Sequence, residues 1–173
     1  AWGGPGGWGQ TVPVAMLLPV SSQQGGDAVI ARSLENAARM AGADLQGVTI
    51  EITVYDTAGQ AATAANVARE AVAAGADVIV GPLRSDAAAA VGVAVASSNI
   101  AVLSFSNNTE IAGSNVFVLG HTFANTAARV VSYAASQGRN RIVVAHAQNL
   151  AGDVARDAVL RAAQASSANV VSV

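Results

Sequence analysis

The sequence has no cysteine and no lysine, and only 4% of its 173 residues are aromatic. Without cysteine the chain can form neither a disulfide nor a thiolate metal site. Without lysine it has neither a P-loop lysine nor a Schiff-base lysine. The nine basic residues are all arginine, and they are scattered along a chain whose net charge is −2. This scatter argues against a nucleic-acid partner, which requires a clustered basic face, and gives no reason to expect binding to an acidic membrane surface.

Long hydrophobic runs are also missing. The chain is 52% hydrophobic, but no apolar run approaches the roughly 20 residues that span a bilayer. The hydropathy comes largely from 40 alanines, which lie in segments with helical spacing. The N-terminus has no basic region followed by an apolar core, so no signal peptide is expected within this chain. The composition therefore predicts an alanine-rich α/β protein.

The first residues are rich in glycine. Residues 1–10 contain five glycines, one proline and both tryptophans, and we predict that residues 1–11 form a flexible leader. Gly4, Gly6 and Gly9 spell a G-x-G-x-x-G motif. A dinucleotide-binding motif follows a strand and opens a helix, whereas this one precedes the first strand, so we do not interpret it as a phosphate site.

From residue 12 onward, strand-like and helix-like segments alternate regularly. The expected strands are 12–20, 48–56, 77–83, 100–105, 115–120, 141–147 and 169–173. The first helix is expected to have one apolar face, formed by Ile30, Leu34, Ala37, Ala38 and Ala41. The central strands are continuous apolar runs, as in sheets that are covered on both faces. This alternation predicts an α/β fold with a parallel sheet and helices on both faces.

Short polar side chains follow four successive strands of this predicted sheet. Ligands of open parallel sheets lie outside the carboxyl ends of the strands, where helix N-termini favour a carboxylate or another anion. The densest cluster lies in the stretch VLSFSNNTE, residues 102–110, and we interpret it as the rim of a ligand cleft. The same residue types also form helix caps and turns, so Ser85 suits a cap as well as a contact, and Asp56 suits a turn.

The sequence gives little support for catalysis. His121 and His146 are far apart along the chain, and His146 is expected at a strand end or in the core. The chain has no G-x-S-x-G or H-E-x-x-H motif, and its acidic residues are spread over separate elements. We therefore expect no catalytic residue, no metal site and no cofactor.

Five segments in order carry a resemblance to a known family: VAMLLPVSS, VYDTAG, AGADVIVGPLRSD, IAVLSFSNN and NVFVLG. Over about residues 12–173 they resemble the type I periplasmic solute-binding proteins, and within them the leucine/isoleucine/valine-binding branch. The wording LLP-[LV]-S, D-T-x-G, GPL and FSN is most similar to the lipoproteins called penicillin-binding-protein activators. No single motif is diagnostic, but their order and gaps match.

The resemblance implies two Rossmann-like lobes that close on a ligand, with residues 12–119 as the first lobe and 120–173 as an incomplete second lobe. It also implies a non-enzymatic, periplasmic ligand-binding module that serves an ABC transporter, with an amino acid or another small polar solute as ligand. Any membrane attachment would be through a lipid anchor that is absent from this chain. The ligand-binding residues that it implies are Ser21, Ser22, Ser85, Ser106, Asn107 and Asn108.

One departure from the family favours an alternative. The amino-acid binders usually have an aromatic residue after the first strand, whereas this chain has Ser22, Gln23 and Gln24. This favours the activator branch, an envelope lipoprotein domain that regulates peptidoglycan synthesis by contact with a cell-wall synthase. An enzyme of unrecognised type is a third, weaker interpretation.

The incomplete second lobe predicts association between copies of the chain. A strand pair without a full sheet leaves apolar faces and open edges. The valines expected to need a partner are Val143, Val144, Val170 and Val171, so we expect a homo-oligomer formed through residues 121–173.

Overall fold

The structure is a computed structural model that describes residues 10–173, apart from the side chains of residues 150 and 151. Residues 1–9 of the predicted leader lie outside the described residues, and Gln10 and Thr11 belong to the first strand. The chain divides between Gly120 and His121 into two compact units.

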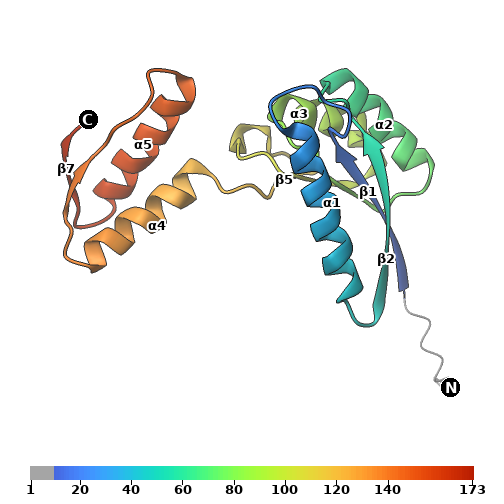
Figure 1. Ribbon diagram of the computed structural model, residues 1–173, viewed down its shortest axis with the longest axis horizontal. Coiled ribbons are helices and arrows are strands. Elements are labelled where there is room, and N and C mark those ends of the chain that lie inside the picture. Colours follow the sequence, from blue (N-terminus) through green and yellow to red (C-terminus); the bar gives the residue numbers. More distant parts are fainter. Residues whose placement is uncertain (1–9) are drawn as a thin grey trace. The chain divides into compact units, whose positions relative to one another are not determined.

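The first unit is a five-stranded parallel sheet with helices on both faces (Figure 1). The strands run in the order β2-β1-β3-β4-β5, and every neighbouring pair is parallel. This confirms the predicted fold class. The elements are β1 (Gln10–Leu18), α1 (Asp27–Ala43), β2 (Val48–Asp56), α2 (Ala61–Ala73), β3 (Val78–Val80), α3 (Ser85–Ala94), β4 (Ala101–Ser104) and β5 (Val116–Val118), with two short 3-10 turns, η1 (Ala96–Ser98) and η2 (Thr109–Ile111).

The second half of the inner strand β1 is buried on both faces, because its side chains alternate between two cores. Ala15 and Leu17 pack with α2 and α3, whereas Val14, Met16 and Leu18 pack with α1. This period of two is the geometry of an extended strand, and a strand covered on both faces has apolar residues at every position. The continuous apolar run in the sequence is therefore explained.

The face of α1 that packs on the sheet differs from the predicted apolar face. Asp27, Ala31, Leu34 and Ala38 face the sheet, at the i, i+4, i+7, i+11 spacing of one helical stripe. Three residues predicted for this face are exposed instead: Ile30, Ala37 and Ala41. The prediction was wrong because a buried carboxylate, Asp27, occupies the first position of the stripe, and apolar periodicity cannot reveal it.

Strand pairing sets the ends of β1 and β2. The two strands align residue for residue, from Gln10 opposite Val48 to Leu18 opposite Asp56. The first strand thus begins and ends two residues earlier than the predicted 12–20. The second strand has its predicted bounds, because the chain turns directly after Asp56.

The second unit contains α4 (Phe123–Ser136), β6 (Arg141–Val143), α5 (Leu150–Gln164) and β7 (Asn169–Ser172). The two strands are parallel and are joined through α5. Its small core is formed by Ala127, Val131, Val144, Ala158 and Ala163. The strand predicted at 141–147 is shorter, because its pairing shifts register after Ile142. None of the described helices combines the length and the hydropathy that crossing a bilayer requires.

Candidate functional site

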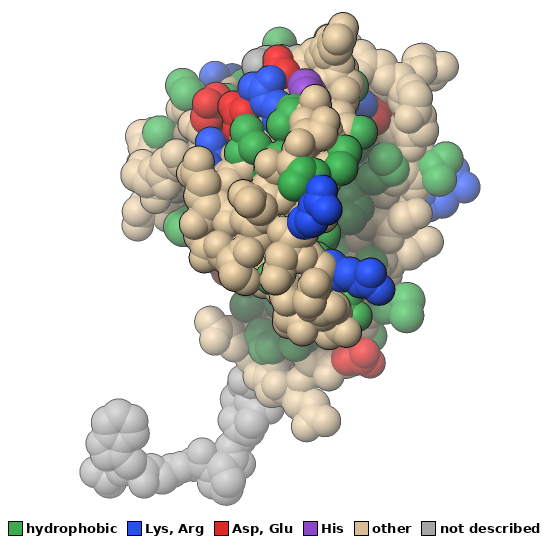
Figure 2. All heavy atoms as spheres, turned by 90° about the vertical axis from the view of Figure 1, so that its left-hand side faces the viewer, with side chains coloured by type: hydrophobic (Ala, Val, Ile, Leu, Met, Phe, Trp, Pro, Cys, Tyr) green, Lys and Arg blue, Asp and Glu red, His purple; other side chains and the backbone are tan. Residues whose placement is uncertain are grey.

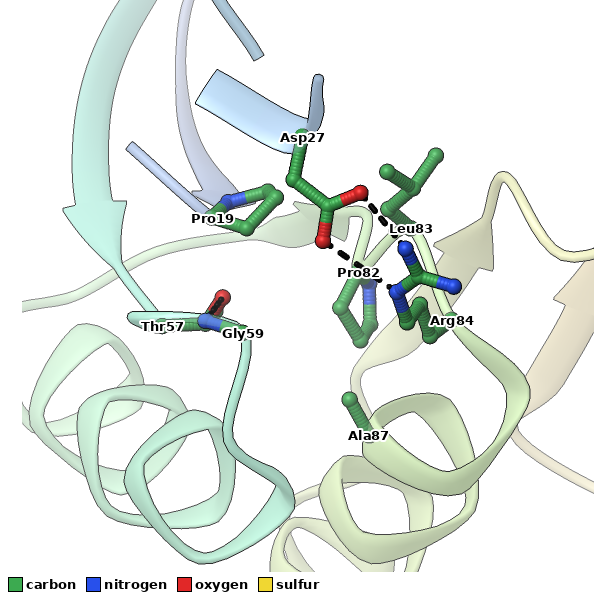
Figure 3. Close-up of a pocket in the computed structure, with 8 residues that line it drawn as sticks. All are labelled: Pro19, Asp27, Thr57, Gly59, Pro82, Leu83, Arg84 and Ala87. Atoms are coloured by element: carbon green, nitrogen blue, oxygen red, sulfur yellow. Dashed lines mark hydrogen bonds and ion pairs between the residues drawn. The ribbon is translucent and has the colours of Figure 1, made fainter. Parts of the chain in front are cut away.

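The strand order changes direction between β1 and β3, because β2 lies on one side of β1 while β3, β4 and β5 lie on the other. A crevice at the carboxyl ends of the two strands beside such a switch point is the usual ligand site of open α/β sheets. A small pocket lies there (Figure 3), lined by Pro19, Asp27, Thr57, Pro82, Arg84 and Ala87. Its volume of about 10 Å³ admits roughly one water molecule, so a larger ligand would lie at its mouth.

A bidentate ion pair joins the two sides of this pocket. The Arg84 guanidinium donates from Nη2 to Asp27 Oδ1 over 2.6 Å and from Nε to Oδ2 over 3.2 Å. Asp27 is the first residue of α1 and only 1% exposed, whereas the Arg84 side chain is 48% exposed. Hydrogen bonding and Coulomb attraction from Asp27 raise the pKa of Arg84.

Neither member of this pair was among the predicted site residues. The two residues are 57 positions apart, and no local pattern links them. The sequence shows an Asp at the start of a helix, but only the structure shows that it is buried.

Asp56 forms a turn at the end of β2. Its Oδ1 accepts hydrogen bonds from the Ala58 amide, at 2.8 Å, and from the Ser21 amide, at 3.2 Å. Burial raises the pKa of Asp56, but these bonds and one from the Ser21 hydroxyl outweigh burial and hold the pKa below its usual range. The sequence left open whether Asp56 forms a turn or contacts a ligand, and the structure shows the turn.

The two serines after β1 differ in exposure. Ser21 is exposed, and its hydroxyl bonds Asp56. Ser22 is buried; its Oγ donates to Asp27 Oδ2 over 3.4 Å and accepts from the Gln24 amide over 3.2 Å. The Ser22 hydroxyl therefore supports the loop and the buried carboxylate, and the ligand role of both serines stays a prediction.

The polar run after β4 forms a series of local hydrogen bonds. Ser104 Oγ donates to the Pro82 carbonyl and accepts from the Ser106 amide, each over 3.1 Å. Ser106 Oγ accepts from the Asn108 amide, and Asn108 Oδ1 from the Glu110 amide. Every second side chain thus binds the amide two residues ahead, which is the pattern of successive Ser and Asx turns. Much of this run stabilises the loop itself.

Ser85 does not cap α3, and the cap interpretation is wrong. The N-cap residue is Arg84, no side chain caps the helix, and Ser85 is the first helical residue. The next residue, Asp86, lies inside the helix, and its Oδ1 accepts from the Ala87 amide over 2.8 Å. The boundary lies one residue earlier because Arg84, held by Asp27, is in an extended conformation.

Ser85 and Asn107 lie at the same edge of the sheet. They follow β3 and β4, which are parallel neighbours. A hydrogen bond joins the loops after these two strands, because the Phe105 amide donates to the Pro82 carbonyl over 3.1 Å. Ser85 is half-buried and Asn107 is exposed. This edge therefore offers a hydroxyl, an amide and the first amides of α3 to a small polar or anionic ligand.

In the second unit, His146 follows the end of β6, as expected for a strand-end residue. Its Nδ1 lies 3.7 Å from Asp153 Oδ1, and Arg156 bonds the same carboxylate over 3.3 Å. Across the described part of the chain, no three side chains of the metal-binding types come close enough together to hold a metal ion.

Residues 11–173 match the sequence profile of a family described as periplasmic binding protein. The chain belongs to this family. The match confirms the superfamily predicted from the sequence. One curated relative of this periplasmic binding protein is the uncharacterized protein RP748 of Rickettsia prowazekii (strain Madrid E). The two sequences are 27% identical over 122 residues, which cover 70% of this chain and 32% of RP748.

Solved structures show the same fold at low sequence identity, each covering 94% of this chain. An ABC transporter substrate-binding protein from Desulfitobacterium hafniense is 19% identical with a TM-score of 0.69. The leucine-binding protein LivK of Thermotoga maritima MSB8 is 17% identical with a TM-score of 0.62. A solute-binding protein of an ABC transporter from Rhodopseudomonas palustris BisB5 is 19% identical with a TM-score of 0.65. The chain spans 46–50% of the length of these proteins.

Proposed function

We propose that this chain is a non-enzymatic solute-binding module of the ABC transporter substrate-binding type, that it works in the periplasm, and that it binds a small polar solute. The observation that carries the proposal is the carboxyl edge of β1, β3 and β4, where Ser85, Asn107 and the N-terminus of α3 lie together at the switch point. Membership of the periplasmic binding protein family supports it.

We propose a small carboxylate as the solute class. One structural relative is named a leucine-binding protein, and another was solved in complex with 3,4-dihydroxy benzoic acid. Both solutes carry a carboxylate, and the helix N-terminus at the edge favours an anion. An amino acid and an aromatic acid are therefore the first candidates.

The six predicted ligand-binding residues divide into two groups in this proposal. Ser85 and Asn107 contact the solute, because their side chains are half-buried or exposed at the edge. The other four position the loops around it: Ser21, Ser22, Ser106 and Asn108.

Amide chemical-shift mapping by NMR tests the proposal, because it detects weak binding to a single chain. The ¹⁵N-labelled chain is titrated with L-leucine, with 3,4-dihydroxybenzoate and with glucose as a neutral solute. We expect shifts at the amides of residues 84–87 and 105–109 for at least one solute, and weaker binding in Ser85→Ala. A matched control is Ser136→Ala, since Ser136 is exposed in the second unit and bonds only its own helix at the Tyr133 carbonyl. Shifts that avoid the edge, or none at millimolar solute, would contradict the proposal.

The alternative, regulation of a cell-wall synthase, has one structural observation in its favour. The Ser22 hydroxyl is buried and bound within the loop, so the segment that replaces the family's aromatic residue has one group fewer to offer a small solute. The same labelled chain distinguishes the two proposals. If the regulatory domain of a penicillin-binding protein broadens the edge signals and no solute shifts them, the alternative holds.

A further inference from the structure

Asp27 is a fixed anchor at the switch point. Its side chain is 2% exposed, and both oxygens accept hydrogen bonds from Arg84 while the Ser22 hydroxyl also donates to Oδ2. A buried carboxylate that is bound through both oxygens has a single orientation. A guanidinium held by two parallel bonds is fixed with it, because the fork geometry of arginine matches a carboxylate.

Part of the guanidinium remains available for a second anion. Arginine has five N–H groups, and the pair with Asp27 uses Nε and Nη2. The third nitrogen, Nη1, points away from Asp27 in Figure 3, and among the residues that the structure describes it has no hydrogen-bond acceptor. The side chain is 48% exposed, so this outer side is accessible from the solvent.

The surroundings favour an anion on the outer side of Arg84. The residue is the N-cap of α3, whose first amides add partial positive charge. The pocket behind the pair has room for about one water molecule, so a solute cannot bind behind the guanidinium. Asp86 places an opposing charge near Arg84, and its Oδ1 accepts a hydrogen bond from the Ala87 amide.

We propose that Arg84 binds the carboxylate of the solute, and that the buried Asp27 is the positioning residue that presents the guanidinium. This inference rests on the proposed function of the same edge and adds a residue that the sequence did not assign. The solute carboxylate would form an Asp27–Arg84–solute bridge, with Ser85 beside it in the chain.

The side-chain Nε–H signal of Arg84 reports this binding directly. The ¹⁵N-labelled chain is titrated with sodium acetate as the simplest carboxylate, against sodium chloride at equal ionic strength. We expect acetate to shift the Arg84 Nε–H signal together with the Ser85 amide. The variant Arg84→Gln is expected to bind acetate at least about tenfold more weakly, since a hydrogen bond to a charged group is lost.

Arg39 provides a matched control within the same molecule. It donates to Glu35 from Nε over 2.9 Å and from Nη2 over 2.7 Å, and its side chain is 51% exposed. Its partner Glu35 is half-buried, with a side chain 30% exposed, and lies eight residues beyond Asp27 along α1. Its Nε–H signal should not respond to acetate beyond the response to chloride.

Because Arg84→Gln leaves Asp27 buried without its partner, the double variant Asp27→Asn/Arg84→Gln serves as the second test. Equal acetate shifts at Ser85 in the wild type and in either variant would overturn the inference and leave Arg84 as a clamp between loops. So would equal responses of Arg84 and Arg39. If glucose shifts the edge amide signals while acetate shifts the Nε–H signal of neither arginine, this inference fails but the solute-binding proposal stands. If no solute shifts the edge amide signals, the proposed function itself fails.

Discussion

At the scale of single residues, the polar side chains of the carboxyl edge have two kinds of role. Ser22, Ser104 and Ser106 are buried and hydrogen bonded within the loops, whereas Ser85 is half-buried and Asn107 is exposed. The residue types at the edge could be predicted from the sequence, because they follow successive strands. Their roles could not, because Ser, Asn and Asp serve turns and ligands with the same oxygens.

Ser85→Ala should change binding more than stability. Because Ser85 does not cap α3, we expect the free energy of unfolding to change by less than about 0.5 kcal/mol while solute binding weakens. The control is Thr122→Ala, since Thr122 caps α4 through a 3.1 Å bond from the Asn125 amide and its loss should cost about 1 kcal/mol. Urea denaturation measures the free energy of unfolding of both variants. Equal losses of stability in Ser85→Ala and Thr122→Ala would contradict this account of Ser85.

Asp56 should stabilise the protein in a pH-dependent way. Its folded pKa lies below the model-compound value of 3.8, so the unfolded chain takes up the proton first as the pH falls. Its contribution is therefore fully present above that value and is lost as the pH drops through the folded pKa. We expect Asp56→Asn to be less stable than the wild type at neutral pH, and the difference to shrink in acid. Thermal melting of both proteins over this range measures it, and a difference independent of pH would count against the turn described here.

At the scale of elements, regular alternation was enough to predict the strands and helices, and pairing decided their ends. Local periodicity cannot show that β1 aligns with β2 from Gln10 onward. It also cannot show that the stripe of α1 begins with the charged Asp27, so Ile30 was assigned to the wrong face. The short turns η1 and η2 were missed because three residues carry no periodicity.

The loop from β3 to α3 should depend on glycine at position 81. Gly81 has φ +103°, and a Cβ there would overlap the Leu17 carbonyl oxygen. We expect Gly81→Ala to lower the free energy of unfolding by at least about 1–3 kcal/mol and to displace Arg84. Gly113→Ala is the control, because a Cβ at Gly113 meets nothing within 4 Å. Urea denaturation that finds the two variants equally stable would refute this role.

At the scale of the whole molecule, the fold class and the family could be predicted, since both depend on the order of elements and motifs along the chain. The Asp27–Arg84 pair could not, because it forms only when the carboxyl ends of separate strands meet. The second unit consists of α4 and the β6–α5–β7 piece. Val144 is buried in it, contrary to the prediction that it needs a partner, while Val143 and Val171 are exposed. The space-filling view shows hydrophobic side chains at the surface of the molecule (Figure 2).

We predict that copies of the chain associate through this second unit. Val143 is 68% exposed, and exposed apolar strand faces with open edges favour pairing between molecules. The double substitution Val143→Ser/Val171→Ser should lower the association constant measured by sedimentation equilibrium. The control is Val93→Ser on α3 of the first unit, where Val93 is 81% exposed, and it should leave association unchanged. A wild-type chain that stays monomeric at high concentration would contradict the prediction.

The most direct test of the whole account is a crystal structure of this chain grown with 3,4-dihydroxybenzoate or L-leucine. The account predicts electron density for the solute at the carboxyl edge, with its carboxylate within hydrogen-bonding distance of Arg84 and Ser85. Solute bound instead in the groove at the other end of α1, beside Arg39, Leu45 and Val48, with the carboxyl edge empty, would contradict the central claim.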